Sequence, residues 1–463
     1  MSLETFLKSV DAFQQLSPQR VRMLASQCQQ RSYASGERII SRGGAGDAMY
    51  IIQSGEVRIP VVDEGGREKF VARLGSREFF GEMALLTGEP RGADVYADGA
   101  VECIVIPRAP LQAFLRQNPQ VASFLTEILG NRLLENDQIR QVGKYRLIGE
   151  LGRGGMAIVY EGLHPTLGRT VAVKMLSHEL VYDQEFATRF KNEAKIIARL
   201  EHKNIVRVYD YEEVYATFFI IMEKVEGTDL ALNLESQGVL PFEKTRTILS
   251  QLAAGLAYAH EHGVIHRDIK PSNVILDADG VVKLMDFGIA KERTEEEKEG
   301  EEDIIGTAEY MSPEQALGRK MDGRADIYSL GVMAFEMVTG RLPFDSHDPY
   351  EILRKHIREP MIPPVKVNPA CPPDLNELVL RCCAKDPKDR YANAQQIVDF
   401  LAKHMKKPGE GFDPNRQRSK TLTIIYENDQ DTRQRVEDAV RAFVRGARKV
   451  PGVTIGYGDI QFN

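Results

Sequence analysis

Two carboxylates that lie close together in the chain indicate chemistry on a strongly charged group. Asp268 belongs to a His-Arg-Asp triplet, Asn273 follows five residues later, and Asp286 begins an Asp-Phe-Gly triplet. The alternating run between them is broken by Asp279 and Gly280, a pair that is typical of a hairpin turn. A hairpin can hold both carboxylates and the amide rigidly around one small volume, as metal-assisted transfer of a highly charged group requires.

The full stretch, HRDIKPSNVILDADGVVKLMDFG at residues 266–288, resembles the catalytic and metal-binding loops of protein kinases. The resemblance implies that Asp268 accepts or orients the proton of the substrate hydroxyl, and that Lys270 steadies the transferred γ-phosphoryl group. It also implies that Asn273 and Asp286 hold Mg²⁺. ATP and Mg²⁺ are therefore the expected cofactors, and a protein with a Ser or Thr hydroxyl is the expected substrate.

A glycine-rich turn upstream is typical of a loop that covers phosphates. Residues 147–162, LIGELGRGGMAIVYEG, predict two strands joined by glycines, whose backbone N–H groups can approach phosphates closely. The third glycine of the family motif is replaced by Ala157, but bacterial eukaryotic-like Ser/Thr kinases have a similar Gly-Gly-Met run. By the resemblance, the ATP-binding residues of this turn are Gly152, Gly154, Gly155 and Val159.

The next motif supplies two further candidate catalytic residues. The string VAVK predicts a strand that ends at Lys174, and residues 186–200 predict a helix that carries Glu193. On the kinase match, Lys174 contacts the α- and β-phosphates and pairs with Glu193. The value of this pair lies in positioning the phosphates, because an exposed ion pair contributes only about 0–1 kcal/mol to stability.

Residues 219–225 resemble the hinge that joins the two lobes of a kinase. There the side chain of Met222 lines the ATP pocket, and the backbones of Glu223 and Val225 bind adenine. The match covers residues 144–405, with every catalytic position filled and in order. Two more residues resemble the large-lobe residues that brace the catalytic loop, Asp326 and Arg390.

Three residues near the activation segment are candidate regulatory sites. Arg267 is the kind of arginine that pairs with a phosphothreonine in related kinases. Thr294 opens an acidic run that ends at Asp303, and it is the candidate for autophosphorylation, which would make the chain a phosphoprotein. Thr307, in the string GTAEYMSPE, resembles Ser/Thr rather than Tyr kinases. The acidic run can substitute in part for activating phosphates, or it can be a solvated charge run.

The first 140 residues have a different pattern. Ser17 and Pro18 predict the start of a short helix. Regular short β segments with glycine turns then predict a small barrel or jelly roll. The predicted strands are residues 38–40, 49–52, 56–62, 69–74 and 101–106.

Within this barrel, the strings FGEMALL and PRGA resemble the phosphate-binding cassette of cyclic nucleotide-binding domains, as does GDAMYIIQSGEV upstream. By that resemblance, Glu82 holds the ribose 2′-hydroxyl and Arg91 holds the cyclic phosphate, while Gly81 and Ala84 shape the turn. Gly92 has no hydroxyl group that could meet guanine, which favours cAMP over cGMP as the regulatory ligand. The alternative is a degenerate barrel that is kept for packing or dimerisation.

The regions outside these two motif sets have simpler patterns. Residues 121–142 have the apolar spacing of a helix that runs without a linker into Gly143, so they can transmit a shift or act as a rigid spacer. Residues 406–420 predict a linker. Residues 421–463 predict a small α/β segment of unknown role, too short to bury a core of its own.

The composition sets limits on partners and compartment. The 463 residues carry a net charge of −7, which gives no reason to invoke nucleic acid or an anionic membrane. No apolar run is long enough to span a membrane, and the N-terminus lacks a signal-peptide pattern, so a cytoplasmic protein is expected. Five cysteines without CxxC spacing favour buried thiols over a disulfide or metal role.

Together these patterns predict a multidomain α+β protein for signal transduction. A cyclic nucleotide-binding domain, a β jelly roll or barrel with flanking helices, is expected at 1–140 and a bilobal Ser/Thr kinase domain at 144–405. The predicted function is ATP-dependent phosphorylation of protein substrates under the control of a cyclic nucleotide, in a layout similar to cGMP-dependent protein kinase. Two alternatives stay open: an active kinase whose barrel serves homodimerisation or protein interaction, and a catalytically silent scaffold.

Overall fold

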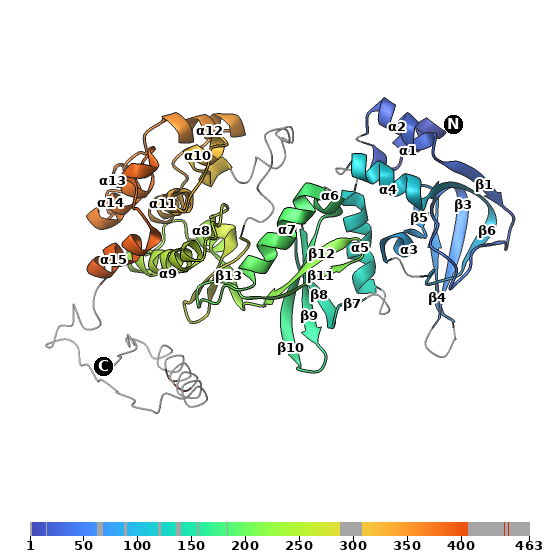
Figure 1. The fold of residues 1–463 in the computed structure, drawn as a ribbon, viewed down its shortest axis with the longest axis horizontal. Helices are drawn as coiled ribbons and strands as arrows, with labels where there is room; N and C mark the ends of the chain where they lie inside the picture. The colour runs from blue at the N-terminus through green and yellow to red at the C-terminus, as the bar shows by residue number, and fades with distance from the viewer. Residues whose placement is uncertain are drawn as a thin grey trace. The chain divides into compact units, whose positions relative to one another are not determined.

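The computed structural model describes residues 2–14, 16–62, 68–87, 90–118, 122–135, 140–154, 157–182, 184–287 and 308–405, together with positions 439 and 443. The chain divides into two compact units, which are described separately (Figure 1). The first unit comprises residues 1–199 and 207–224, and the second comprises residues 200–206 and 225–463. Among the described residues, no helix has both the length and the apolar character needed to cross a membrane.

The N-terminal part of the first unit is an antiparallel six-stranded sheet with helices before and after it and one helix, α3, between its last two strands. The strand order is β1-β6-β3-β4, while β2 pairs with β6 and β5 pairs with β3. The strands are β1 (Gln29–Tyr33), β2 (Arg38–Ile40), β3 (Ala48–Val62), β4 (Glu68–Leu74), β5 (Phe79–Phe80) and β6 (Val95–Pro107). The helices are α1 (Leu3–Lys8), η1 (Asp11–Phe13), α2 (Pro18–Ala25), α3 (Glu82–Thr87), α4 (Arg108–Gln117) and α5 (Ser123–Glu135).

Local sequence signals explain several of these elements. The predicted helix start at Ser17 is confirmed, because its hydroxyl caps α2 by accepting a hydrogen bond from the N–H of Arg20. The two strands predicted at 49–52 and 56–62 are wrong as separate elements, since β3 runs through both. Gly55 adopts a φ of 85° beside two register shifts, so the strand bends at bulges instead of ending in a turn.

The predicted helix over residues 121–142 is wrong at its C-terminal end. The described helix, α5, ends at Glu135, and β7 (Gln141–Val142) is a strand that pairs with β8. Residues 136–139 lie outside the described residues. The apolar positions of a short strand fit a helical spacing by chance, and pairing with a neighbouring strand decides between the two.

The rest of the first unit is a second six-stranded sheet with two helices, of the kind expected for a kinase small lobe. The strand order is β11-β12-β10-β9-β8-β7, and all neighbouring pairs are antiparallel. Its other elements are β8 (Tyr145–Gly154), β9 (Ala157–His164), β10 (Arg169–Leu176), α6 (His178–Tyr182), α7 (Gln184–Ile197), β11 (Val208–Val214) and β12 (Thr217–Glu223).

The second unit is mainly helical. Its small sheet has the order β13-β14-β15, with β13 (Gly227–Asp229), β14 (Val274–Asp277) and β15 (Val282–Leu284). The longest helix among the described residues, α9 (Phe242–Glu261), packs against α11 (Arg324–Thr339) and α15 (Ala394–His404). The other helical elements are α8 (Leu230–Gln237), η3 (Pro271–Asn273), η6 (Ala308–Tyr310), α10 (Pro313–Ala316), α12 (Pro349–Arg358), α13 (Pro364–Val367), α14 (Pro373–Cys382) and η7 (Pro387–Asp389).

The predicted hairpin of this unit is confirmed, and the prediction of buried cysteines holds for four of the five in the chain. The predicted Asp-Gly hairpin joins β14 to β15, and Gly280 takes a φ of 81° that suits glycine. The carboxylate of Asp277 fixes the turn by accepting hydrogen bonds from the N–H groups of Asp279 and Val281 at 2.9 and 2.8 Å. Four of the five cysteines are buried, and Cys28 is half-buried.

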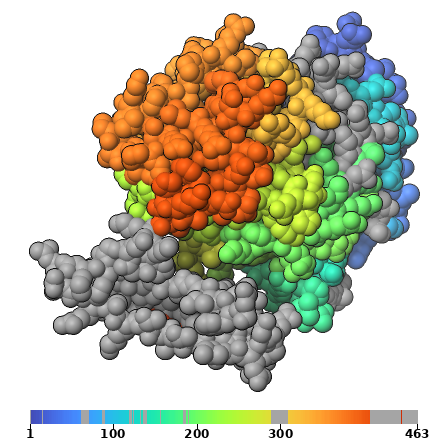
Figure 2. All heavy atoms as spheres, turned by 60° about the vertical axis from the view of Figure 1, so that its left-hand side comes forward, coloured from blue at the N-terminus to red at the C-terminus, as the bar shows by residue number. Residues whose placement is uncertain are grey.

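In the space-filling view, residues 308–405 form one continuous orange to red surface (Figure 2).

Candidate active site and nucleotide-binding pocket

The predicted catalytic residues of the second unit lie together in one loop before β14. Asp268 is buried, and its Oδ2 atom accepts a hydrogen bond from Asn273 Nδ2 at 3.0 Å. Lys270 Nζ lies 3.2 Å from the same oxygen. Asn273 Nδ2 also donates to the main-chain oxygen of Asp268 at 2.8 Å. The carboxylate is therefore held in one orientation, as a group that orients a substrate hydroxyl must be.

A buried aspartate holds this loop in a conformation that the chain would otherwise avoid. Arg267 has a φ of 65°, a region that costs a residue with a side chain about 1–3 kcal/mol. Asp326 in α11 accepts hydrogen bonds from the main-chain N–H groups of His266 and Arg267, each at 2.8 Å. Burial acts to raise the pKa of Asp326, but the hydrogen bonds from His260 and from the main-chain N–H of His266 hold it below its usual range. Asp326 therefore braces the catalytic loop, as the sequence predicts.

His266 connects the catalytic loop to the Asp-Phe-Gly segment, a role that sequence reasoning missed. Its Nε2 atom donates to the main-chain oxygen of Met285 at 2.9 Å, and its Nδ1 atom accepts from the N–H of Asp268. Its ring also lies 4.6 Å from that of Phe287, centroid to centroid. Burial lowers the pKa of His266, so the ring is neutral and can accept at Nδ1. The family motif contains this histidine, but its spacing alone does not indicate which atoms it contacts.

The two candidate Mg²⁺ ligands come from neighbouring backbone positions. The N–H of Met285, the residue before Asp286, donates to the main-chain oxygen of Asn273 at 2.9 Å. Because Nδ2 of Asn273 donates to Asp268, its Oδ1 atom is the one that can ligate a metal. Within the described residues, no group of three or more His, Cys, Asp or Glu side chains forms a metal site. The pair fits Mg²⁺, which in such sites takes one or two protein oxygens and completes its shell with phosphates and water.

The candidate ATP residues of the first unit lie on one face of the small-lobe sheet. Lys174 in β10 pairs in register with Val159 in β9, and Met222 in β12 pairs with Ala172 two positions before Lys174. Strand alternation therefore places Lys174, Val159 and Met222 on the same face. The N–H of Glu223 donates to the main-chain oxygen of Arg207 at 2.8 Å, and Glu223 is the last residue of β12.

The remaining candidates of the ATP site are placed as follows. Gly152 and Gly154 lie in the last part of β8, and a Cβ atom at Gly152 would meet no heavy atom within 4 Å. Glu193 lies in α7 and is half-buried. Val225 belongs to the second unit. Gly155 lies outside the described residues, as do the regulatory candidates Thr294 and Thr307.

A cavity of about 610 Å³ opens beside the catalytic loop within the second unit. Lys270 lines it together with four carboxylates, which are Asp229, Glu235, Glu309 and Glu336. Burial and the neighbouring Asp345 raise the pKa of Glu309, while Lys270 acts in the opposite direction. Burial likewise raises the pKa of Glu336, which accepts a hydrogen bond from the Tyr310 hydroxyl at 2.6 Å. These shifts reduce the negative charge of Glu309 and Glu336, but four carboxylates against one lysine still favour a cationic occupant.

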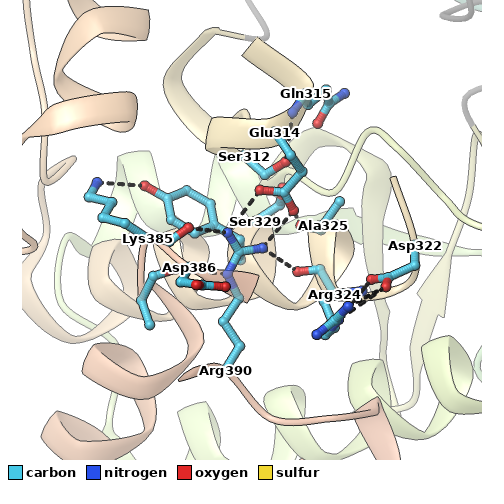
Figure 3. Close-up of polar contacts among 12 residues, drawn as sticks. Ser312, Glu314, Gln315, Asp322, Arg324, Ala325, Ser329, Lys385, Asp386 and Arg390 are labelled. Carbon is cyan, nitrogen blue, oxygen red and sulfur yellow. Dashed lines mark hydrogen bonds and ion pairs between the residues drawn. The ribbon is translucent and has the colours of Figure 1, made fainter. Parts of the chain in front are cut away.

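Arg390 forms a structural ion pair with Glu314, and its other hydrogen bonds go to main-chain oxygens outside residues 266–273. Figure 3 shows its guanidinium in a fork with the carboxylate of Glu314, the first acidic residue of α10, at 2.7 and 2.8 Å. It also donates to the main-chain oxygens of Arg324, Ala384 and Lys385. Arg390 thus anchors the segment that follows η6. A sequence motif does not reveal this, because the partners are 76 residues apart.

The predicted cyclic nucleotide residues of the first unit also lie close together. Arg91 is 5% exposed, and its guanidinium donates to the main-chain oxygens of Ala45, Gly81 and Ala48 and to Asp47 Oδ1. Gly81 has a φ of 82°, and a Cβ atom there would lie 2.7 Å from Arg91 Nη1. Only glycine therefore allows the guanidinium to lie against this turn.

Two further residues of the predicted cyclic nucleotide site, one acidic and one small, lie in α3. Glu82 follows Gly81 at the start of α3 and is 3% exposed. Ala84, two residues further along the same helix, contacts Gly46 so closely that a Cβ atom at position 46 would lie 2.5 Å from the Cβ of Ala84. Sequence reasoning quoted Gly46 and Asp47 within a longer string without assigning either a role. The sequence feature that could have indicated their role is the Gly-Asp pair directly before β3.

Comparison with known proteins agrees with these two sites. Residues 145–401 match the model of the protein kinase domain, and residues 30–118 match that of the cyclic nucleotide-binding domain. Because the kinase match covers more than half of the chain, the protein belongs to the protein kinase family. More particularly, it combines a kinase domain of the bacterial Ser/Thr type with an N-terminal cyclic nucleotide-binding domain.

Individual relatives are bacterial kinases. A probable serine/threonine-protein kinase of Clostridium acetobutylicum is 41% identical over 259 residues, which are 56% of this chain and 39% of that protein. The serine/threonine-protein kinase PksC of Streptomyces coelicolor is 44% identical over 267 residues, 56% of this chain and 48% of PksC. The chain thus spans less than half of the length of these curated relatives. The crystal structure of the Mycobacterium tuberculosis PknI kinase domain is 30% identical, with a TM-score of 0.47, covering 57% of this chain and 97% of that one.

Proposed function

We propose that this protein transfers the γ-phosphoryl group of ATP to Ser or Thr residues of protein substrates. The observation that carries the proposal is the fixed Asp268 carboxylate, held by Asn273 and Lys270 in a loop that Asp326 braces. Asp268 orients the substrate hydroxyl, Lys270 offsets charge on the phosphoryl group, and Asn273 with Asp286 holds Mg²⁺. Lys174 and Glu193 position the α- and β-phosphates, and the glycines of β8 cover them.

The acidic cavity beside Lys270 is where the acceptor peptide binds. It lies next to the catalytic loop, and residues of η6 line it from the segment that follows the activation loop. Its carboxylates come from β13, α8, η6 and α11, so a peptide with basic residues near the Ser or Thr would pair with several of them. A peptide with acidic residues at the same places would be repelled.

The N-terminal domain binds a cyclic nucleotide that regulates the kinase. Arg91 supplies the guanidinium for the cyclic phosphate and Glu82 the carboxylate for the ribose hydroxyl, with Gly81 and Ala84 shaping the turn. The site around Gly92 has no hydroxyl from that residue, and a Cβ atom there would meet no heavy atom within 4 Å. This favours cAMP over cGMP. Control of activity requires that cAMP bind one state of the protein more tightly than another.

Two measurements test these assignments. Radiolabelled phosphate transfer from ATP and Mg²⁺ to a basic Ser/Thr peptide is expected for the unmodified chain, while Asp268→Asn should abolish it without loss of the fold. An inactive chain with intact ATP binding would instead support the scaffold alternative.

Calorimetric titration with cAMP, repeated with Arg91→Lys, tests the proposed function of the N-terminal domain. Absence of heat in the unmodified chain would favour a barrel used for homodimerisation or protein interaction.

A further inference from the structure

Helix α5 of the nucleotide-binding domain covers the face of the small-lobe sheet that is opposite to Lys174 (Figure 1). The residues on this face are at most 2% exposed, and they are Leu147, Ile158, Tyr160, Val171, Val173 and Met175. They share one apolar cluster with Leu125, Leu129 and Leu133 of α5 and with the helices at the N-terminus. A single hydrophobic core therefore joins the end of the nucleotide-binding domain to the sheet that carries the ATP residues.

The closest approach occurs at Gly130, in the middle of α5. The hydroxyl of Tyr160 donates to the main-chain oxygen of Gly130 at 3.3 Å. A Cβ atom at Gly130 would lie 2.6 Å from Ile158 Cδ1 and 3.1 Å from Tyr160 Oη. Glycine destabilises a helix interior relative to alanine, so its presence here is explained by direct contact between the helix backbone and β9. Val159, between these two contacts, points to the face that carries Lys174.

A polar contact fixes the other end of α5 to the segment that follows β10. The Thr126 hydroxyl lies 3.0 Å from His178 Nδ1 and accepts the main-chain N–H of His178 at 2.8 Å. His178 Nε2 in turn donates to the main-chain oxygen of Tyr215 at 2.9 Å. Thr126 and His178 are both buried, so these bonds are made in an apolar surrounding.

Helices α5 and α6 also line a small cavity that includes Glu82, although Gly81 and Arg91 of the proposed cyclic nucleotide site do not line it. Tyr182, at the end of α6, lines a small cavity together with Leu125 of α5. Glu82 and Leu85 of α3 line that cavity from the opposite side. The carboxylate proposed to hold the ribose and two elements packed on the ATP-binding sheet therefore share one cavity.

We propose that α5 positions the strand pair β8–β9 for ATP binding and transmits the occupancy of the cyclic nucleotide pocket to it. Gly130 is the positioning residue, because the backbone at this point sets the separation between α5 and β9. A change at α3 reaches α5 through Leu125 and α6 through Tyr182, and from there it reaches the strands beside the glycine-rich turn. The second part of this proposal rests on the proposed binding of cAMP.

Crowding at Gly130 tests the positioning role in the full chain. Gly130→Ala should raise the KM for ATP about three- to tenfold while kcat changes less than twofold, because β9 is displaced but the catalytic loop is not touched. Ile158→Val removes the Cδ1 atom that the new Cβ would meet, and it should have little effect alone. The double variant should recover most of the ATP affinity. A purely structural role would lower thermal stability without this split between KM and kcat.

Two outcomes would overturn the positioning role. One is an unchanged KM for ATP in folded Gly130→Ala, and the other is a raised KM that Ile158→Val does not correct. If Gly130→Ala fails to fold, Thr126→Val provides a second perturbation, since it removes the bonds to His178 at nearly constant volume. It should shift the KM for ATP in the same direction, and an unchanged KM in the folded variant would count against the proposal.

Measurements with cAMP separate this proposal from the proposed function. The KM for ATP of the unmodified chain should change when cAMP is added, and this response should be weakened in Gly130→Ala. Calorimetric binding of cAMP without any change in the KM or kcat would overturn transmission through α5. Absence of calorimetric binding would overturn the cyclic nucleotide function and the transmission that rests on it, while rescue in the Gly130→Ala, Ile158→Val pair would still support positioning.

Discussion

Removal of the Arg390 guanidinium should destabilise the second unit far more than removal of an exposed arginine near it. The Arg390 side chain is 0% exposed, and Glu314 is 11% exposed. Arg390→Met would leave the Glu314 carboxylate buried without its fork and would take a donor from three main-chain oxygens. Truncation of one partner in a buried pair costs about 3–5 kcal/mol, and we expect a loss of this size in the free energy of unfolding.

Arg324 provides the matched control. It pairs with Asp322 at 2.7 Å close to the same cluster, but the two side chains are 30% and 57% exposed (Figure 3). Arg324→Met should therefore cost only about 0–1 kcal/mol. The main-chain oxygen of Arg324 still accepts from Arg390 in this variant, so the buried fork is unchanged.

Urea denaturation followed by far-UV circular dichroism measures both changes, and phosphate transfer measures the effect on activity. Glu314→Gln combined with Arg390→Met should cost less than the sum of the two single changes, because no unpaired charge is then buried. Arg390→Met should also reduce activity under conditions in which the protein is folded, since the fork anchors α10 next to η6. A loss below 1 kcal/mol, or equal losses for Arg390→Met and Arg324→Met, would refute the reasoning.

Three further predictions use different features. Burial lowers the pKa of His178 and of His356 to about 4, so the unfolded chain binds one extra proton per histidine between pH 6.5 and pH 4. The free energy of unfolding should therefore fall by about 3 kcal/mol per histidine over this range, as urea midpoints will show. Asp268→Asn should lower kcat by at least about 10²-fold with an unchanged melting temperature. The sequence has no tryptophan, so Tyr182→Trp introduces a single reporter whose fluorescence should respond to cAMP in the parent but not in an Arg91→Lys background.

Local chemistry explains which features could be predicted from the sequence. The Asp-Gly hairpin and the Ser17 cap depend on a few adjacent residues, and both are found as expected. The family motifs led to Asp268, Lys270 and Asn273, which the structure places around one oxygen. In these cases, the contacts lie within one loop or one turn.

Features that depend on distant partners could not be predicted in this way. β3 continues through Gly55 because β6 pairs with it on both sides of the bulges. Gln141 and Val142 form a strand because β8 is there to pair with them. The partner of Arg390 and the contacts of His266 likewise come from segments that only the tertiary fold brings together. The contact between Gly130 and β9 could not be predicted for the same reason, because a single glycine in a helical pattern does not show what packs against it.

The shared core around α5 has a consequence for how this kinase can be divided or recombined. A fragment that begins at Lys144, where the kinase motifs begin, would expose the apolar face formed by Ile158, Tyr160 and Val173 to water. Such a patch promotes aggregation, so the catalytic part should be obtained in monomeric form only when α5 is retained. Exchange of the N-terminal domain for another one would likewise require a terminal helix with a small residue at the place of Gly130. The N-terminal domain and the kinase domain are therefore separate in sequence, but a change in α5 at their shared core requires a matching change in the strands that it contacts.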